Sequence, residues 1–159
     1  FLSALLLALG GPDADGLLPR DKDDLTRELG TWLFINREAV KNTRPTPVTR
    51  DGDIYYTQAK DGSAVFAIVA DRPWPPRKWQ DIVLPSLEAT ERTAIEVLGH
   101  GGALVEYRPD LKPQPTWKQR DDGLHVRAML AQRIYNDWAW PNPPVLKLTG
   151  VRFRNSPAH

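Results

Sequence analysis

The apolar positions near the start of the chain form an unbroken run followed by a helical stripe. Residues 5–9 read Leu-Leu-Leu-Ala-Leu without alternation, which is typical of a strand covered on both faces in a parallel sheet. The run breaks at Gly10-Gly11-Pro12, and the aspartates and glycine of residues 13–16 favour a chain reversal. A helix is predicted next, because apolar residues recur at helical spacing. Its stripe consists of Leu25, Leu29, Trp32 and Leu33.

The predicted helix ends before a proline-rich exit. Pro45 and Pro47 cannot continue a helix, because proline lacks the amide donor and disfavours helical geometry in the residue before it. A buried strand, a turn and a covering helix make one βα unit of a larger parallel α/β domain. A parallel strand needs neighbours on its edges, and the rest of the sequence offers none. We therefore predict a domain boundary at residues 43–47.

Beyond this boundary the pattern changes to short strands separated by glycine and proline. Residues 64–70 are apolar at every position, which predicts a central strand covered on both faces, and Asp61-Gly62 is a hairpin turn before it. Two other candidates alternate, with residues 124, 126 and 128 facing inward in one and residues 146 and 148 in the other. Eight short strands at this spacing favour an antiparallel sandwich. The candidates are residues 54–57, 64–70, 79–84, 93–98, 103–107, 116–119, 124–129 and 145–151.

Composition and charge exclude several classes of partner. With 41% hydrophobic and 26% charged residues, the chain is globular. Its 21 basic and 20 acidic residues are interspersed, so the sequence carries no electrostatic footprint for nucleic acid or an anionic membrane. The apolar opening is far shorter than the ~20 residues that span a bilayer, so no membrane insertion is expected. Without cysteine there is no disulfide framework and no thiolate metal site.

The order and spacing of several short motifs carry a family resemblance over nearly the whole chain. In the first part these are Leu5-Leu6-Leu7, Gly11-Pro12, Asp15-Gly16, Leu18-Pro19, Leu25, Leu29-Gly30, Trp32-Leu33, Asn36, Glu38-Ala39 and Thr43-Arg44-Pro45. In the second part they are residues 54–57, 63–68, 98–101 and 146–151. The series resembles the last barrel strand and helix of retaining α-L-fucosidases and the β-sandwich that follows them. The family tends to place glycine after the asparagine that ends this helix, whereas Arg37 follows Asn36 here. Asn36 can itself take the left-handed cap conformation.

The resemblance implies a mostly β fold: an antiparallel β-sandwich of about eight strands, preceded by one βα unit from the end of a (β/α) barrel. Residues 1–44 would be the terminal strand and helix of the barrel catalytic domain, 45–52 a linker, 53–152 the C-terminal β-sandwich and 153–159 a tail. The parent reaction would be hydrolysis of terminal α-L-fucose with retention. In the family both catalytic carboxylates lie on earlier parts of the barrel, so we expect no catalytic residue, cofactor or metal in this chain. The family also implies a secreted, periplasmic or lysosomal location.

Tryptophans are the residues for which a binding role is physically attractive. A sugar ring has an apolar face that can lie on an indole, and the indole can donate a hydrogen bond. Trp74 lies among prolines, and Trp138 and Trp140 precede Pro141, so all three are expected in loops and are candidates for carbohydrate contact. The alternative is that they close the ends of the sandwich or pack against the barrel. Leu25, Leu29, Trp32 and Leu33 are predicted to make core or interdomain contacts.

Polar residues offer no recognisable catalytic arrangement. His100, His125 and His159 have no serine or carboxylate partner at a catalytic spacing, and they are expected to be structural or solvated. The aspartate clusters lie in predicted turns and at a helix start, where carboxylates cap backbone amides. No phosphate-binding loop is legible, because the glycines near residue 100 lie between strands.

Three functional hypotheses follow. The first is the C-terminal portion of an α-L-fucosidase-like glycoside hydrolase, which braces the barrel and is not catalytic alone. Its partners would be the missing catalytic barrel of the same parent chain and, by resemblance, fucosylated glycans. The second is a barrel-less structural subunit, derived from a fucosidase and packed in a larger assembly. The third is a carbohydrate-binding module, which the loop tryptophans favour and the apolar opening strand disfavours.

Overall fold

The computed structural model describes residues 20–70, 72, 74–75, 78–100, 114–130 and 143–154, with the helix side chains described from Thr26 onward. The strands expected at residues 5–9 and 103–107 lie outside this part. The described part begins with helix α2 (Arg20–Ile35), followed by a 3-10 turn, η1 (Arg37–Ala39). Helix α2 is neither long nor apolar enough to cross a membrane.

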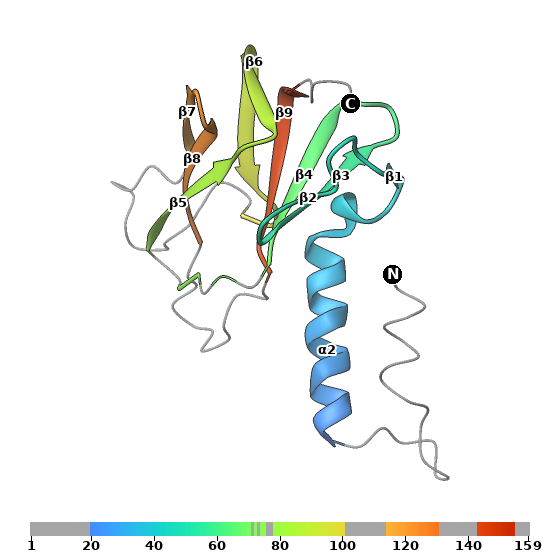
Figure 1. The fold of residues 1–159 in the computed structure, drawn as a ribbon. Helices are drawn as coiled ribbons and strands as arrows, with labels where there is room; N and C mark the ends of the chain where they lie inside the picture. The colour runs from blue at the N-terminus through green and yellow to red at the C-terminus, as the bar shows by residue number, and fades with distance from the viewer. Residues whose placement is uncertain are drawn as a thin grey trace.

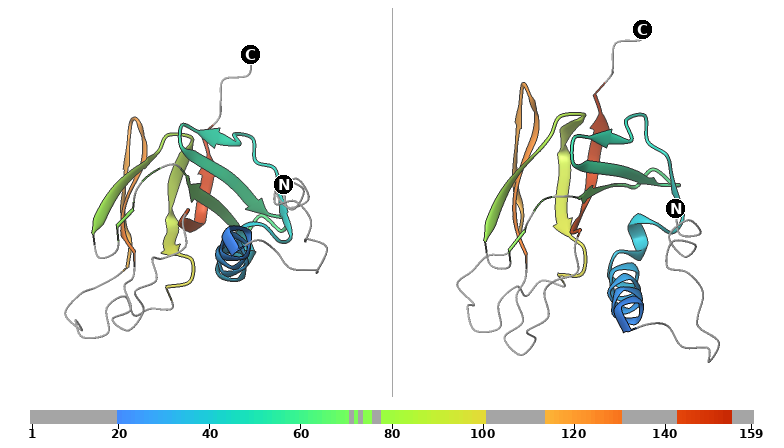
Figure 2. Two further views of the ribbon diagram at one scale, coloured as in Figure 1. Left: turned by 90° about the horizontal axis from the view of Figure 1, so that it is seen from below. Right: turned by 60° about the horizontal axis from the view of Figure 1, so that its bottom comes forward.

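The remaining elements are strands in two antiparallel sheets (Figure 1). The larger sheet has the order β1-β3-β4-β9-β6, with β2 also paired to β3, and the smaller sheet has the order β5-β8-β7. The sheets face each other, and α2 projects beside the larger one (Figure 2). The predicted mostly β, antiparallel sandwich is therefore confirmed. The strands are β1 (Thr43–Arg44), β2 (Arg50–Asp51), β3 (Ile54–Ala59), β4 (Ala64–Val69), β5 (Trp79–Leu84), β6 (Leu87–Val97), β7 (Thr116–Arg120), β8 (Gly123–Met129) and β9 (Val145–Phe153).

Strand β4 is the central strand that its sequence predicts. It pairs with β3 on one edge and with β9 on the other. Val65, Ala67 and Val69 point into the core between the two sheets. Ala64 and Phe66 point to the opposite face, where they join a second apolar cluster. Both faces of this strand are covered, which is why it shows no alternation.

The core between the sheets follows the predicted alternation. In β8, Leu124, Val126 and Ala128 are buried and meet residues of the larger sheet. In β9, Leu146 and Leu148 are buried in the same core. The intervening side chains of both strands point away from it. Each fully buried side chain of this size contributes roughly 1.5–3 kcal/mol to folding, so this core is the main source of stability.

The segment between the helix and the first long strand is part of the sheet. Thr43 and Arg44 pair with the end of β3, and Arg50 and Asp51 pair with its beginning. The expectation that Asn36 takes the left-handed conformation is wrong, because its φ is −102°. Its side-chain amide instead donates a hydrogen bond to the Trp32 carbonyl in the helix. Asn42 takes the left-handed conformation, with φ 58°. Its carbonyl accepts a hydrogen bond from the Lys60 amide at 3.0 Å, so the reversal occurs where β1 meets the sheet.

A polar network ties the edge of the larger sheet to the connection between β5 and β6. The Tyr56 hydroxyl donates to the Asp51 carboxylate at 3.0 Å, and Ser86 donates to the same carboxylate from its amide and its hydroxyl at 3.0 and 2.9 Å. Burial, reinforced by the Asp51 charge, raises the pKa of Tyr56. The tyrosine ring packs edge-on against Phe153, with centroids 5.8 Å apart. Three separate chain segments are fixed together at this point.

Gly150 allows β6 and β9 to stay paired across a bulge between Ala89 and Ala94. Its φ is 63°, and the Thr90 and Thr93 hydroxyls both donate to its carbonyl, at 2.6 and 2.8 Å. A Cβ at this position would lie 2.6 Å from the Arg92 carbonyl carbon. Because the obstacle is backbone, the site has no room for a side chain.

We expect Gly150→Ala to destabilise the chain far more than Gly52→Ala. Both glycines have φ near 60°, but a Cβ at Gly52 would meet nothing within 4 Å. Gly52→Ala should therefore cost about 1 kcal/mol for the left-handed backbone, whereas Gly150→Ala adds a backbone clash and should cost roughly 3 kcal/mol or more. Equilibrium urea unfolding of the purified variants measures the difference, and equal losses would contradict this account.

Candidate functional site

The most developed feature outside the core is the junction between the end of α2 and the outer face of the larger sheet. The Trp32 indole donates a hydrogen bond to the Pro143 carbonyl at 2.6 Å. Asn36, which is 1% exposed, donates from its backbone and side-chain nitrogens to the Trp32 carbonyl at 2.8 and 3.1 Å. These bonds close the last turn of the helix and attach it to the segment before β9.

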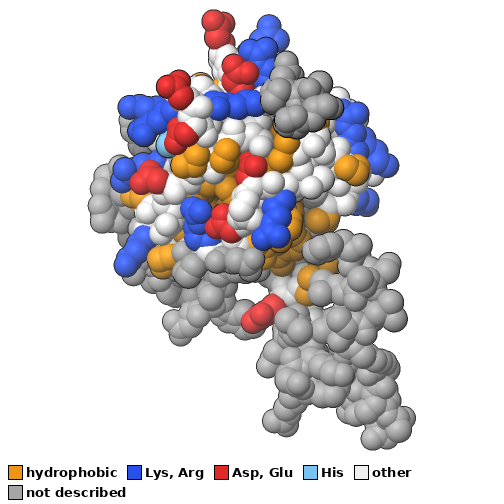
Figure 3. Space-filling view, viewed as in Figure 1, with side chains coloured by type: hydrophobic (Ala, Val, Ile, Leu, Met, Phe, Trp, Pro, Cys, Tyr) orange, Lys and Arg blue, Asp and Glu red, His pale blue; other side chains and the backbone are white. Residues whose placement is uncertain are grey.

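An apolar cluster lies beneath this junction, and we call it the junction cluster. Hydrophobic side chains gather where the sandwich meets the helix, while charges of both signs are mixed over the rest of that face (Figure 3). The cluster covers the second face of β4, so the helix end and η1 act as the third layer of the fold. Its buried members are Ala39, Ala64, Phe66, Leu98 and Val145, and Trp32, Ala59 and Ile68 pack against them.

A charged group holds η1 onto the sheet beside the junction cluster. The Lys147 ammonium lies 2.8 Å from a Glu38 carboxylate oxygen and 3.3 Å from one of Glu96. The hydrogen bond to Glu38, with a further bond to Glu96, raises the pKa of Lys147. The three residues come from η1, β9 and β6, so this ion group connects the helical part to two strands of the sheet.

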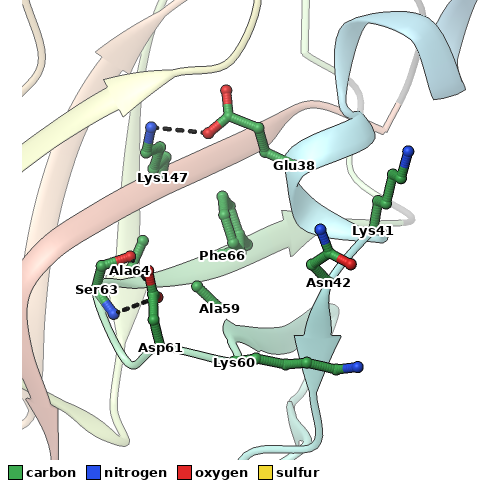
Figure 4. Close-up of a pocket in the computed structure, with 10 residues that line it drawn as sticks. All are labelled: Glu38, Lys41, Asn42, Ala59, Lys60, Asp61, Ser63, Ala64, Phe66 and Lys147. Carbon is green, nitrogen blue, oxygen red and sulfur yellow. Dashed lines mark hydrogen bonds and ion pairs between the residues drawn. The ribbon is translucent and has the colours of Figure 1, made fainter.

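A surface hollow of about 320 Å³ opens next to this ion group (Figure 4). Phe66 and two alanines lie at its base, and Phe66 is only 2% exposed. The ring therefore offers almost no face on which a sugar could stack. Polar side chains surround the base. The lining residues are Glu38, Lys41, Asn42, Ala59, Lys60, Asp61, Ser63, Ala64, Phe66 and Lys147.

The described residues contain no recognisable catalytic or metal-binding constellation. Glu38 and Glu96 both form ion pairs with the single Lys147 ammonium, and their side chains are largely open to solvent. Asp61 is bonded by the amide and hydroxyl of Ser63, and the amide bond contributes most to the lowered pKa of that carboxyl. Within the described part of the chain, no group of three or more His, Asp or Glu residues could hold a metal ion.

Of the three tryptophans considered for carbohydrate contact, the structure describes Trp74. It is 3% exposed and belongs to the core between the sheets. Its indole nitrogen is buried without a hydrogen-bond partner among the described residues. This position supports the packing alternative for Trp74. Trp138 and Trp140 lie outside the described residues, and their contact with sugar stays a prediction.

The helical stripe meets the sandwich through Trp32. Leu29 and Leu33 are half-buried, and the side chain of Leu25 lies outside the described part. The interdomain role of the stripe stays a prediction. Sequence reasoning missed Phe34, which is 76% exposed on the other side of the helix. The sequence alone could have indicated the exposure of Phe34, because a residue two positions after Trp32 cannot share the Trp32 face of a helix.

The described histidines take structural positions. Burial lowers the pKa of His100 from 6.5 to about 4. His125 lies on the outward face of β8, with its Nε2 atom 2.6 Å from a carboxylate oxygen of Asp122. This hydrogen bond is the main cause of the lowered pKa of Asp122. His159 lies outside the described residues.

We expect the partly buried His100 to make folding stability decrease in acid. Between pH 6.5 and about 4 the unfolded chain binds a proton at this residue that the folded chain does not. The free energy of unfolding should therefore fall as the pH decreases through this window, by at most about 3 kcal/mol. Urea unfolding across this range should show a flatter profile for His100→Gln than for the wild type or His125→Gln. Parallel profiles for wild type and His100→Gln would contradict the assignment.

The curated proteins that are similar to this chain in sequence include several α-L-fucosidases. No protein-family model matches the chain. It is 29% identical to the tissue α-L-fucosidase of Bos taurus over 147 residues, which cover 89% of this chain and 27% of the bovine protein. It is 34% identical to the plasma α-L-fucosidase of Rattus norvegicus over 98 residues, covering 60% of this chain and 21% of the rat protein. The chain thus spans about a quarter of the length of these curated relatives.

Solved structures show the same fold. The α-L-fucosidase isoenzyme 1 from Paenibacillus thiaminolyticus aligns with 91% of this chain and 30% of its own, with a TM-score of 0.55 at 19% identity. A GH29 α-L-fucosidase from Bacteroides thetaiotaomicron aligns with 94% of this chain and 28% of its own, with a TM-score of 0.55 at 16% identity. The chain is therefore a homologue of the α-L-fucosidases that corresponds to one part of them, consistent with a C-terminal fragment of a fucosidase.

Proposed function

We propose that this chain is the non-catalytic C-terminal portion of an α-L-fucosidase-like glycoside hydrolase, in which it braces the catalytic barrel. The parent reaction is retaining hydrolysis of terminal α-L-fucose from glycoconjugates, in a secreted, periplasmic or lysosomal setting. The observation that carries the proposal is the pattern of coverage: one fucosidase relative matches 89% of this chain, yet the match takes up 27% of that relative.

The chemistry of the described residues agrees with a non-catalytic role for this chain. A retaining glycosidase needs two carboxyl groups about 5–5.5 Å apart across the sugar, one as nucleophile and one as acid and base. Among the described residues, Glu38 and Glu96 share a single ammonium, that of Lys147, on an outer surface. In the proposed function the catalytic carboxyl groups lie in another part of the parent protein.

The structure supports bracing through its third layer. The end of α2 and η1 are fixed to the sheet by the Trp32 bond to Pro143, the junction cluster and the Lys147 ion group. A rigid connection of this kind holds the sandwich at a set position relative to whatever α2 packs against. The burial of Trp74 removes one of the three indoles on which the carbohydrate-binding alternative depends.

The proposal predicts that the isolated chain is inactive and that α-L-fucosidase activity co-purifies with it from its own cells. The purified 159-residue chain should release no aryl alcohol from an aryl α-L-fucoside above the rate measured in buffer alone. An affinity tag placed on this sequence at its natural locus should recover α-L-fucosidase activity from cell or medium fractions. Turnover that follows the isolated chain through purification would overturn the non-catalytic role. Tagged material without fucosidase activity would overturn the fucosidase assignment.

A further inference from the structure

The surface hollow beside the Lys147 ion group contains polar groups that the fold leaves unused. Asp61 accepts both bonds from Ser63 through its Oδ1 atom, so its Oδ2 atom has no hydrogen-bond partner among the described residues. Glu38 binds Lys147 through Oε2, which leaves its Oε1 atom equally unused by the described chain. The side-chain amide of Asn42 makes no hydrogen bond to any described residue. Figure 4 shows these three side chains on different sides of the hollow.

The charges around the hollow do not select an ion. The lining carries three ammonium groups and two carboxylates, those of Lys41, Lys60, Lys147, Glu38 and Asp61. An anion at the base would meet both carboxylates, and the Lys147 ammonium is already shared by Glu38 and Glu96. A metal ion would lack ligands, because the described part of the chain holds no group of three or more His, Asp or Glu residues suited to one. The unused groups therefore suit a ligand that is polar but uncharged.

The base of the hollow suits the carbon skeleton of a small ring. It consists of Phe66 and the methyl groups of Ala59 and Ala64. Phe66 is only 2% exposed, so hydrogen bonds from the walls must supply most of the binding and aromatic stacking little of it. The volume of about 320 Å³ lies at the lower end of the ~300–1,000 Å³ typical of ligand sites. A compact, hydroxyl-rich ring fits both the size and the walls.

We propose that this hollow binds one neutral sugar unit of a glycan, whose hydroxyl groups are held by Asp61 Oδ2, Glu38 Oε1 and the Asn42 amide. A hydroxyl group both donates and accepts hydrogen bonds. The carboxylates accept from it, and the amide offers a donor and an acceptor. Lys41 and Lys60 point outward from the margin of the hollow (Figure 4), away from this unit. The inference goes beyond the proposed function, because it assigns a binding role to the non-catalytic portion and does not depend on the fucosidase assignment.

Two substitutions remove ligand contacts and preserve the local fold. Asp61→Asn keeps the Oδ1 acceptor for Ser63 and replaces the free Oδ2 acceptor with a donor. Asn42→Gly removes the amide, and glycine tolerates the φ of 58° at this position. The matched control is Asp122→Asn, because Asp122 also precedes a glycine in an exposed hairpin turn and does not line the hollow.

The test is a titration of the ¹⁵N-labelled 159-residue chain with the methyl glycosides of L-fucose, D-galactose and N-acetyl-D-glucosamine, followed by amide NMR spectra. At least one glycoside should produce saturable shifts of the Asn42 side-chain amide and of the backbone amides of residues 60–63. Asp61→Asn should weaken the binding about tenfold or more, because a hydrogen bond to a charged acceptor is lost. Asn42→Gly should weaken it severalfold, and Asp122→Asn should leave it unchanged. Spectra as dispersed as that of the wild type show that each variant is folded.

Four outcomes would overturn the inference. The first is the absence of saturable shifts with all three glycosides. The second is a set of shifts confined to the indoles of Trp138 and Trp140, which would place the sugar at these tryptophans. The third is stronger binding of inorganic sulfate than of any glycoside at residues 60–63, which would make the hollow an anion site. The fourth is an unchanged affinity in both Asp61→Asn and Asn42→Gly. The fucosidase activity of tagged material tests the proposed function separately.

Discussion

The fold depends on the burial of β4 on both of its faces. A strand that is apolar at every position is stable only where both sides are removed from water, because each exposed large side chain would forfeit roughly 1.5–3 kcal/mol. The smaller sheet covers Val65, Ala67 and Val69. The other face, with Ala64 and Phe66, is covered by Trp32 and Ala39 from the helical part. The helix end is therefore a required layer of the sandwich and not an appendage to it.

This requirement explains how the junction is built. Trp32 of α2 packs against the cluster that contains Phe66, and its indole donates to the Pro143 carbonyl. Because Pro143 lies two residues before the start of β9, the helix is attached close to the strand that neighbours β4. The Lys147 ion group repeats the connection nearby with Glu38. Two independent contacts thus fix the C-terminal end of the helical part.

Much of the sandwich could be predicted from local pattern. The uniformly apolar β4, the alternation of β8 and β9 and the Asp61-Gly62 turn each carry a local signal, and the structure confirms them. The pairing of Glu38 with Lys147 could not be predicted, because the two residues are 109 positions apart and only the folded sheet brings them together. Trp74 was expected in a loop from its neighbouring prolines. Whether a loop tryptophan points outward or into a core depends on the space between the sheets, which local sequence does not encode.

The proposed function implies that α2, which is anchored to the sandwich at Trp32, is covered along its first turns by the rest of the parent protein. Amide hydrogen exchange compares the two situations directly. In the isolated chain we expect slow exchange in β4 and in the last turn of α2, and fast exchange in the first turns of α2. In the parent protein, isolated through a tag on this sequence, the first turns should become protected while β4 is unchanged. Equal exchange along α2 in both samples would contradict the claim.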